Sequence, residues 1–324
     1  MSVLGGNTTD IRSLGCLTMD SLLMNKPDLF SSCNLCGNKR TVPAYSDKEG
    51  TTLVGCVNCG LVYHHPARYS YDWTYPEGTD NQVKYHLRKE RSNELFADRE
   101  MAHLEKYLGK PRQKARVLEI GCGTGSFLKA LRRMGYLNTF GLEINKECAA
   151  YAREIQGLDH IYDEPLESIG FEDGFFDMLI LKHVFEHVAN PKVLLQEMWR
   201  ILEVAGIIGI TVPNYAFIQT GFGRLLGRWP LNGIVSPICH RQHLWYYTPA
   251  VAKLYLQETG FACLEICYSF AWVPFVEMTK KLRPRLGGLA EGLIMSIDRL
   301  CEVAGFWRNF TIVGQRLECG PHTL

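Results

Sequence analysis

The sequence lacks any hydrophobic run long enough to cross a membrane. A transmembrane helix needs about 20 consecutive apolar residues, and the longest candidate, 261–278, is interrupted by Glu265, Pro274 and Glu277. The N-terminal region has no basic segment followed by an unbroken apolar stretch, so a secretory signal is not expected. These absences predict a cytoplasmic protein without a transmembrane segment.

An excess of charge of either sign is also missing. The 35 Lys and Arg residues nearly balance the 34 Asp and Glu residues, for a net charge of +1. Bulk electrostatics therefore gives the chain no attraction to nucleic acid or to an anionic membrane. Its 324 residues are 46% hydrophobic and 21% charged, which suits a globular protein with one large core and a small accessory module.

The chain divides into regions of different composition. From residue 116 onward, apolar strands alternate with amphipathic helices, which predicts an α/β, doubly wound parallel sheet with helices on both faces. Strands are expected at 116–120, 138–143, 177–182, 207–213, 261–269 and 310–317. The expected domains are a mobile tail at 1–30, a two-Cys-pair module at 31–66, a helical linker or lid at 67–112, and a main domain at 113–324 with a helical insertion at about 275–307.

The stretch 282–307 has apolar residues at helical spacing. A helix that lies on a membrane surface would combine such spacing with a basic polar face. Here Glu291, Asp298 and Glu302 accompany Arg299. Packing within the protein, or formation of a homodimer, is therefore the expected role of this stretch.

A glycine turn lies between the first strand of the main domain and the next helix. Residues 117–125 read strand, Gly-x-Gly-x-Gly, helix, an arrangement in which backbone N–H groups at a helix N-terminus hold the polar end of a nucleotide-like ligand. A dinucleotide fingerprint would place its third glycine at Ser126. Glu119 would repel a pyrophosphate but suits a sulfonium ligand with an ammonium group. Glu143, at the end of the next strand, can accept hydrogen bonds from ribose hydroxyls.

Residues 116–214 resemble the class I S-adenosylmethionine-dependent methyltransferases of the small-molecule type. The resemblance is carried by the glycine turn, by 175–180, by Lys182-His183-Val184-Phe185-Glu186-His187 with Asn190-Pro191, and by 197–214, with Ala205-Gly206 where a Gly-Gly pair is common. It implies a Rossmann-like sheet of seven strands and S-adenosylmethionine as cofactor. Three glycines would hold the methionine portion, Glu143 the ribose, and Asp163 or Glu164 would lie near the adenine amino group. The expected cofactor-binding residues are Glu119, Gly121, Cys122, Gly123, Gly125, Glu143, Ile144, Asp163, Glu164 and Lys182.

Two Cys-x-x-Cys pairs precede this domain. Cys33 and Cys36 are separated by 19 residues from Cys56 and Cys59, which is a spacing typical of a four-cysteine zinc ribbon. Four cysteines leave no open coordination position, so a structural Zn2+ is expected rather than a catalytic one; the alternative is two unrelated pairs. The module resembles the zinc-binding leader of some bacterial methyltransferases that act on sugars and natural products, in which it helps to cover the substrate side of the cleft.

Four histidines fall where the chemistry of such a fold is expected. His183 and His187 follow the strand at 177–182, and His240 and His243 follow the next strand. Reacting groups in a doubly wound fold lie at the carboxyl ends of the strands, and histidine can remove a proton near neutral pH. His243, His187 and His240 are the candidate catalytic residues, although each can instead have a structural role.

The expected function is methyl transfer from S-adenosylmethionine to an oxygen, carbon or amine nucleophile of a small molecule, such as a sugar or secondary metabolite. An Asn/Asp-Pro-Pro-Tyr motif, which holds planar nitrogens, is absent after the strand at 177–182. Charges in the zinc module nearly cancel, so nucleic acid is not an expected partner. The alternatives are an RNA methyltransferase guided by the zinc ribbon and a non-catalytic scaffold that binds S-adenosylmethionine.

Overall fold

The computed structural model describes residues 32–46, 52–64, 82–219, 243–269 and 308–320, together with 292, 296, 299 and 300. Several of the sequence-based expectations lie outside the described residues. These are the tail at 1–30, the first part of the expected linker at 67–81, the candidate catalytic residue His240 and most of the helical insertion at 275–307.

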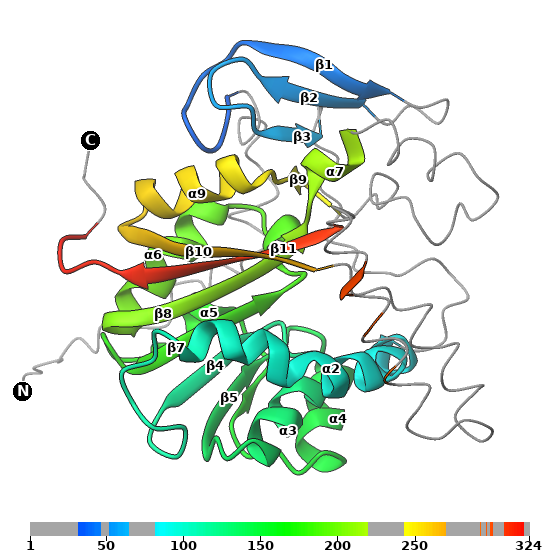
Figure 1. The fold of residues 1–324 in the computed structure, drawn as a ribbon, viewed down its shortest axis with the longest axis vertical. Helices are drawn as coiled ribbons and strands as arrows, with labels where there is room; N and C mark the ends of the chain where they lie inside the picture. The colour runs from blue at the N-terminus through cyan, green and yellow to red at the C-terminus, as the bar shows by residue number, and fades with distance from the viewer. Residues whose placement is uncertain are drawn as a thin grey trace, which may run out of the picture.

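A seven-stranded sheet forms the centre of the molecule (Figure 1). Its order is β10-β11-β8-β7-β4-β5-β6, with strands β4 (Arg116–Ile120), β5 (Asn138–Leu142), β6 (Ile161–Tyr162), β7 (Phe176–Lys182), β8 (Leu202–Pro213), β10 (Phe261–Ser269) and β11 (Asn309–Arg316). The Rossmann-like sheet of seven strands is confirmed.

The sheet is mixed, because its parallel order ends at one edge. The pairs β8·β7, β7·β4, β4·β5 and β5·β6 are parallel, but β11 runs antiparallel to both of its neighbours, β8 and β10. The chain passes from β8 to the edge strand β10 and then returns as β11 between the two. An apolar pattern marks a strand but not its direction, so the sequence did not reveal this reversal.

Helices cover both faces of this sheet. Their bounds are α2 (Gln82–Glu105), α3 (Ser126–Arg133), α4 (Lys146–Glu154), α5 (Leu166–Ile169), the 3-10 turn η1 (Phe185–His187), α6 (Pro191–Ile201), α7 (Tyr215–Gln219) and α9 (Pro249–Glu258). Asn145, Asn190 and Thr248 cap the N-termini of α4, α6 and α9 with their side chains, which satisfies backbone N–H groups that lack a partner within the helix. Among the described helices, none is long and apolar enough to cross a bilayer.

Two buried layers hold the helices on the sheet. On one face, Met101 of α2 and Phe127 of α3 pack with Val117 of β4. On the other face, Met198 of α6 and Tyr255 of α9 belong to a second buried cluster. Each such fully buried side chain contributes roughly 1.5–3 kcal/mol relative to an exposed one. The two layers fix the sheet and leave the carboxyl ends of its parallel strands at one edge.

A second, smaller sheet connects the cysteine module to the main domain. Its order is β1-β2-β3-β9, with strands β1 (Thr41–Ser46), β2 (Thr52–Cys56), β3 (Val62–His64) and β9 (Trp245–Tyr246). Figure 1 shows the module at one end of the molecule, next to α9, β9 and α7. Cys33, Leu61 and Tyr63 of the module lie in the same buried cluster as α6 and α9. The module is therefore packed into the main domain.

Candidate functional site

The glycine turn between β4 and α3 requires glycine for its backbone conformation. Gly121, Gly123 and Gly125 have φ angles of +76°, +55° and +77°, in the left-handed region that other residues rarely adopt. The backbone N–H groups of Gly121 and Cys122 both donate to the carbonyl of Leu142, at 2.7 and 3.0 Å. These bonds fold the turn back onto the end of β5.

The same turn is closely covered by two other parts of the chain. A Cβ atom on Gly121 would lie 2.3 Å from Val184 Cγ2, and one on Gly123 would lie 2.4 Å from His86 Nδ1. Val184 belongs to the segment after β7 and His86 belongs to α2. The glycine turn thus lies between the segment that carries His183 and His187 and helix α2.

Glu143 joins the end of β5 to the glycine turn. Its side chain is buried, and its carboxylate accepts hydrogen bonds from the N–H groups of Gly123, at 2.9 Å, and Asn145, at 2.8 Å. Burial raises the pKa of Glu143, and these two hydrogen bonds oppose that effect. Each carboxylate oxygen retains a second lone pair that can accept a hydroxyl.

Two buried polar atoms beside the turn have no protein partner among the described residues. They are Glu119 Oε2, just before the glycines, and Thr124 Oγ1, within the turn. Burial raises the pKa of Glu119 to about 8, although the Lys182 ammonium group opposes this shift. Buried polar atoms are normally hydrogen-bonded, so these two atoms fit a ligand that brings its own polar and cationic groups, as S-adenosylmethionine does.

Lys182, at the end of β7, holds α2 next to the glycine turn through polar contacts. Its Nζ forms an ion pair with Glu100 at 2.6 Å, donates to Asn93 Oδ1 at 3.3 Å and lies 3.9 Å from the ring centroid of Phe127. Asn93 also donates to Ser126 Oγ at 2.7 Å. Lys182 is one of the cofactor-binding residues expected from the sequence, and that role stays a prediction. The sequence did not indicate that His86 and Asn93 lie near the glycine turn, because no sequence motif is typical of a helix that packs across a turn distant in the chain.

The remaining expected cofactor residues lie at the ends of β4, β5 and β6. Cys122 is buried, and Ile144, directly after Glu143, is 38% exposed. Asp163 is held by Arg153 through an ion pair of 3.0 Å, and Glu164 is exposed. The structure brings these residues to one edge of the sheet together with the glycine turn, and their individual roles stay predictions.

The histidine cluster consists of His183, Glu186, His187 and His243. Glu186 is 1% exposed, and its Oε1 lies 3.5 Å from His183 Nδ1 and 4.0 Å from Nε2 of both His187 and His243. The rings of His187 and His243 meet edge to face with centroids 4.8 Å apart. Two of the three candidate catalytic histidines are thus brought together, His187 from η1 and His243 from two residues before β9.

Glu186 is the member of this cluster that the sequence did not single out. Burial raises the pKa of Glu186, but His183, His187 and His243 outweigh burial and lower it to about 2. Within the described part of the chain, neither of its oxygens has a well-formed hydrogen bond. A buried, ionised carboxylate is costly unless positive or hydrogen-bonding groups face it, and three imidazole rings face Glu186. The sequence showed a Glu-His pair after a strand but not its burial.

The four cysteines of the N-terminal module form a compact cluster. Their Sγ atoms all lie within 4.8 Å of one another, with Cys33 to Cys59 at 3.4 Å and Cys36 to Cys56 at 3.5 Å. These distances exceed the ~2.05 Å of a disulfide and are near the ~3.8 Å that tetrahedral Zn–S bonds of about 2.3 Å require. The cluster could therefore bind zinc.

Backbone turns shape each cysteine pair. The N–H groups of Gly37 and Gly60 donate to the carbonyls of Cys33 and Cys56, at 2.8 and 3.0 Å. Both glycines have φ above +70°, so the residue after each cysteine pair has a left-handed backbone conformation that only glycine adopts without strain. The two turns have the same construction, as expected if both present thiolates to one ion.

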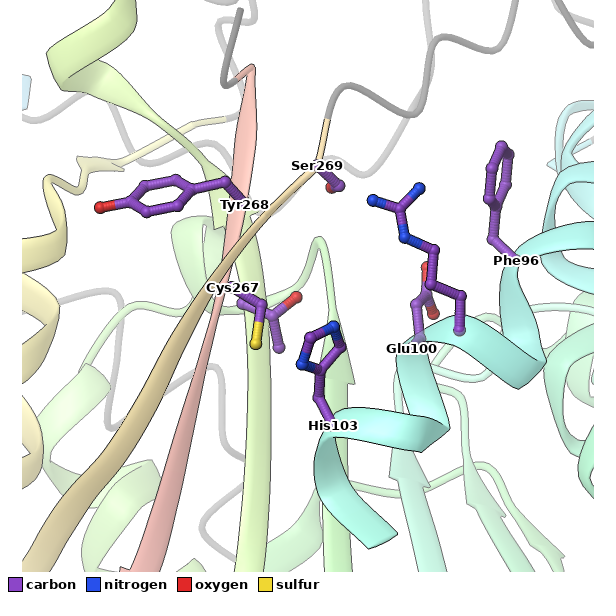
Figure 2. A pocket seen from close by; sticks show the side chains of 8 residues that line it. Phe96, Glu100, His103, Cys267, Tyr268 and Ser269 are labelled. Atoms are coloured by element: carbon purple, nitrogen blue, oxygen red, sulfur yellow. The ribbon is translucent and has the colours of Figure 1, made fainter. Parts of the chain in front are cut away.

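A separate pocket lies between α2 and the end of β10 (Figure 2). Its lining residues are Phe96, Arg99, Glu100 and His103 from α2, Cys267, Tyr268 and Ser269 from β10, and Thr311 from β11. Figure 2 shows His103 close to Cys267, while the Tyr268 ring points away from α2. Glu100 of this pocket also pairs with Lys182 at the end of β7. The pocket and the surroundings of the glycine turn therefore share a residue of α2.

Several known proteins resemble this chain. An uncharacterized protein of Methanocaldococcus jannaschii is 35% identical over 120 residues, which cover 36% of this chain and 53% of that protein. The ubiquinone biosynthesis O-methyltransferase of Maricaulis maris is 29% identical over 162 residues, covering 47% and 61%, and the mitochondrial one of Rattus norvegicus is 24% identical over 177 residues, covering 52% and 50%. The chain spans about half the length of the curated relatives it matches first.

Among solved structures, the chain is similar to a SAM-dependent methyltransferase from Aquifex aeolicus, with 14% identity, a TM-score of 0.46 and coverage of 73% of this chain and 99% of that one. A family model described as a methyltransferase domain matches residues 90–266, more than half of the chain. The matched residues include the glycine turn, Glu143 and the segment with Glu186 and His187, and the family implies S-adenosylmethionine as the cofactor. This chain therefore belongs to the methyltransferase domain family.

Proposed function

We propose that this chain transfers a methyl group from S-adenosylmethionine to a small molecule whose nucleophile loses a proton on reaction, either a hydroxyl oxygen or an acidic carbon. One observation carries this proposal: the Val184 side chain lies against Gly121. That contact puts the histidine cluster next to the turn that would hold the methyl donor. This contact supports the proposal, because a candidate proton acceptor would then lie near the bound cofactor.

The cofactor would bind along the carboxyl ends of β4, β5 and β6. The glycine turn and Glu119 would receive its methionine portion, because Glu119 offers an unpartnered carboxylate oxygen to an ammonium group. Glu143 would accept the ribose hydroxyls, and the exposed side chain of Ile144 would contact the adenine. Asp163 or Glu164 would lie near the adenine amino group.

The cofactor supplies an electrophilic methyl group on a sulfonium. When the acceptor oxygen or carbon takes this methyl group, His187 or His243 would accept the acceptor's proton. The protein mainly aligns the acceptor and excludes water. Glu186, kept ionised at 4.0 Å from both rings, stabilises the imidazolium that forms.

An oxygen acceptor is supported by the names of two curated relatives, both ubiquinone biosynthesis O-methyltransferases. An amine acceptor reacts through a lone pair that is already free and makes less use of a base, so the histidine cluster favours oxygen or carbon over nitrogen. We also infer that the four cysteines hold a structural zinc ion, supported by their mutual distances.

A screen for turnover tests this function. Zinc-loaded protein is incubated with S-adenosylmethionine and separate panels of phenols, sugars, amines and RNA, and S-adenosylhomocysteine is measured. We expect formation with one hydroxyl-bearing or carbon-acid class, reduced in Glu186→Gln. Turnover with amines alone, unaffected by Glu186→Gln, would contradict the proposal, as would turnover confined to RNA. Cofactor binding with no turnover in any panel would support the scaffold alternative instead.

A further inference from the structure

The cysteine module shares a sheet with the strand that follows His243. Strand β3 pairs antiparallel with β9, with Val62 opposite Tyr246 and Tyr63 opposite Trp245. The N–H of His64 donates to the carbonyl of Leu244 at 3.3 Å. Because β9 is only two residues long and has β3 as its neighbour in this sheet, the cysteine module supplies all of its strand pairing among the described residues.

Strand β9 in turn holds the segment that carries Glu186 and His187. The N–H of Leu244 donates to the carbonyl of Glu186 at 2.8 Å, and Trp245 Nε1 donates to the carbonyl of Val188 at 2.7 Å. Trp245 is 1% exposed. A continuous set of hydrogen bonds therefore runs from β3 through β9 to both ends of the segment with the buried carboxylate.

A second connection starts inside the first cysteine pair. Asn34, between Cys33 and Cys36, donates from Nδ2 to Asn190 Oδ1 at 3.1 Å and accepts from the Tyr255 hydroxyl at 3.0 Å. Asn190 caps α6, the helix that follows Glu186 and His187. The first cysteine pair is thus linked by hydrogen bonds to the N-terminus of α6 and to α9.

We propose that metal binding by the four cysteines positions the histidine cluster, so that the cysteine module is a positioning element of the acceptor site. This inference rests on the proposed function for its catalytic meaning, but its structural content is independent of it. A module of this size buries too little apolar surface to fold alone, and its conformation depends on metal binding. Without the ion, β3 releases β9, and His243 separates from Glu186 and His187.

The hydrogen bonds that hold the cofactor half of the site are separate from these contacts. The glycine turn is held by Leu142, Glu143 and α2, and its hydrogen bonds to Leu142 and Glu143 lie within the large sheet and its turns. Metal loss is therefore expected to change the acceptor half and to leave S-adenosylhomocysteine binding intact.

Amide hydrogen exchange on the full-length protein tests this separation. Zinc is removed with a selective chelator, release is quantified with a metal indicator, and exchange is followed at 185–188, 244–247 and 117–120. We expect exchange at the first two segments to accelerate at least about tenfold and at 117–120 in β4 to stay within about twofold, with reversal when zinc is restored. Verified zinc release with unchanged exchange at 185–188 and 244–247 overturns the proposal, and so does equal acceleration at all three segments.

Variants provide a second arm. Cys59→Ser should reproduce the exchange pattern of the chelated protein, whereas Cys319→Ser, at an exposed cysteine outside the cluster, should match the wild type. Asn34→Ala keeps all four thiols, and we expect it to accelerate exchange at 185–188 with zinc still bound; no change would limit the connection to β9 and contradict the second route. Calorimetry with S-adenosylhomocysteine should give a Kd within about threefold of wild type for each variant. A zinc-loaded wild type that fails to bind it would reject the proposed function while leaving the exchange result to decide the positioning role.

Discussion

Glu119 is a buried carboxyl group next to the turn that would receive a cationic cofactor. Burial raises its pKa from 4.5 to about 8 despite the nearby Lys182, so the group is mostly protonated at pH 7 in the free protein. A raised carboxyl pKa in the folded state means that the fold binds an extra proton between pH 4.5 and 8, and that its contribution to stability falls as pH rises through this window.

A cofactor that carries an ammonium group favours the ionised form of Glu119. Binding of S-adenosylmethionine at pH 7 should therefore release up to about one proton, measured by calorimetry in buffers of different ionisation enthalpy. The release should disappear in Glu119→Gln and persist in Glu167→Gln, whose side chain is exposed. A wild type whose binding enthalpy is the same in all buffers would contradict this assignment.

Glu186 makes a different kind of prediction, because its charge faces the histidines. Glu186→Gln keeps the shape of the side chain and removes the charge that stabilises an imidazolium. We expect kcat to fall about 10- to 100-fold, with the Kd for S-adenosylhomocysteine within about threefold of wild type. Glu167→Gln serves as the matched control. A Glu186→Gln variant with unchanged kcat would show that the histidine cluster has no part in proton removal.

At the scale of elements, helix α2 closes the cofactor side of the site. A methyl group on Gly123 would collide with the His86 ring, 2.4 Å from Nδ1, and its φ of +55° adds strain. Gly123→Ala should weaken S-adenosylhomocysteine binding by about tenfold or more. Adding His86→Ala should recover part of that loss, because it removes the steric component. If the double variant binds no better than Gly123→Ala, the cover of α2 over the turn is not what limits binding.

The other end of α2 is tied to β10. Glu265 of β10 contacts His103 Nδ1 at 2.9 Å and Lys106 Nζ at 3.1 Å. Burial raises the pKa of Glu265, but the hydrogen bonds from His103 and Lys106 outweigh it and lower the pKa to about 2. A lowered carboxyl pKa gives stability that is present above pH 4.5 and is lost as pH falls towards 2.

Thermal unfolding tests this contact between α2 and β10. Glu265→Gln should lower Tm by a few degrees at pH 7, where the carboxylate is ionised, and the difference from wild type should shrink as the pH is lowered below about 4. A difference that is the same at both pH values would mean that the charge of Glu265 does not stabilise the fold.

The sequence predicted the elements whose pattern is local. The strands at 116–120 and 177–182 follow from apolar runs. It did not predict the direction of β11, which depends on pairing with β8 and β10. It also missed β9, since two residues carry no periodic pattern and pair with β3 from far away in the chain.

The candidate site shows the same division between local and distant information. The glycine turn, Glu143 and the four cysteines were predicted because their chemistry lies in a short motif or a fixed spacing. Glu186 was not among the candidate catalytic residues, because its proposed role depends on burial and on His243, which comes from another part of the chain. His86 was missed because only the packing of α2 brings it to Gly123.

In the whole molecule, the two sheets form opposite sides of the candidate site at the carboxyl ends of the parallel strands. The large sheet and α2 form the side that would hold the cofactor, and the small sheet of the cysteine module reaches the histidine cluster through β9. The segment after β7 lies between them, because Val184 touches the glycine turn while Glu186 is held by β9. The proposed methyl donor and proton acceptor would meet where these two parts adjoin.

The central claim is that the glycine turn and Glu143 form a cofactor site, and calorimetry of zinc-loaded protein with S-adenosylhomocysteine tests it most directly. We predict a single site on the wild type. In Glu143→Gln, one hydrogen-bond acceptor becomes a donor, and binding should weaken by about tenfold or more. Absence of binding to the wild type, or equal affinity of wild type and Glu143→Gln, would contradict the account.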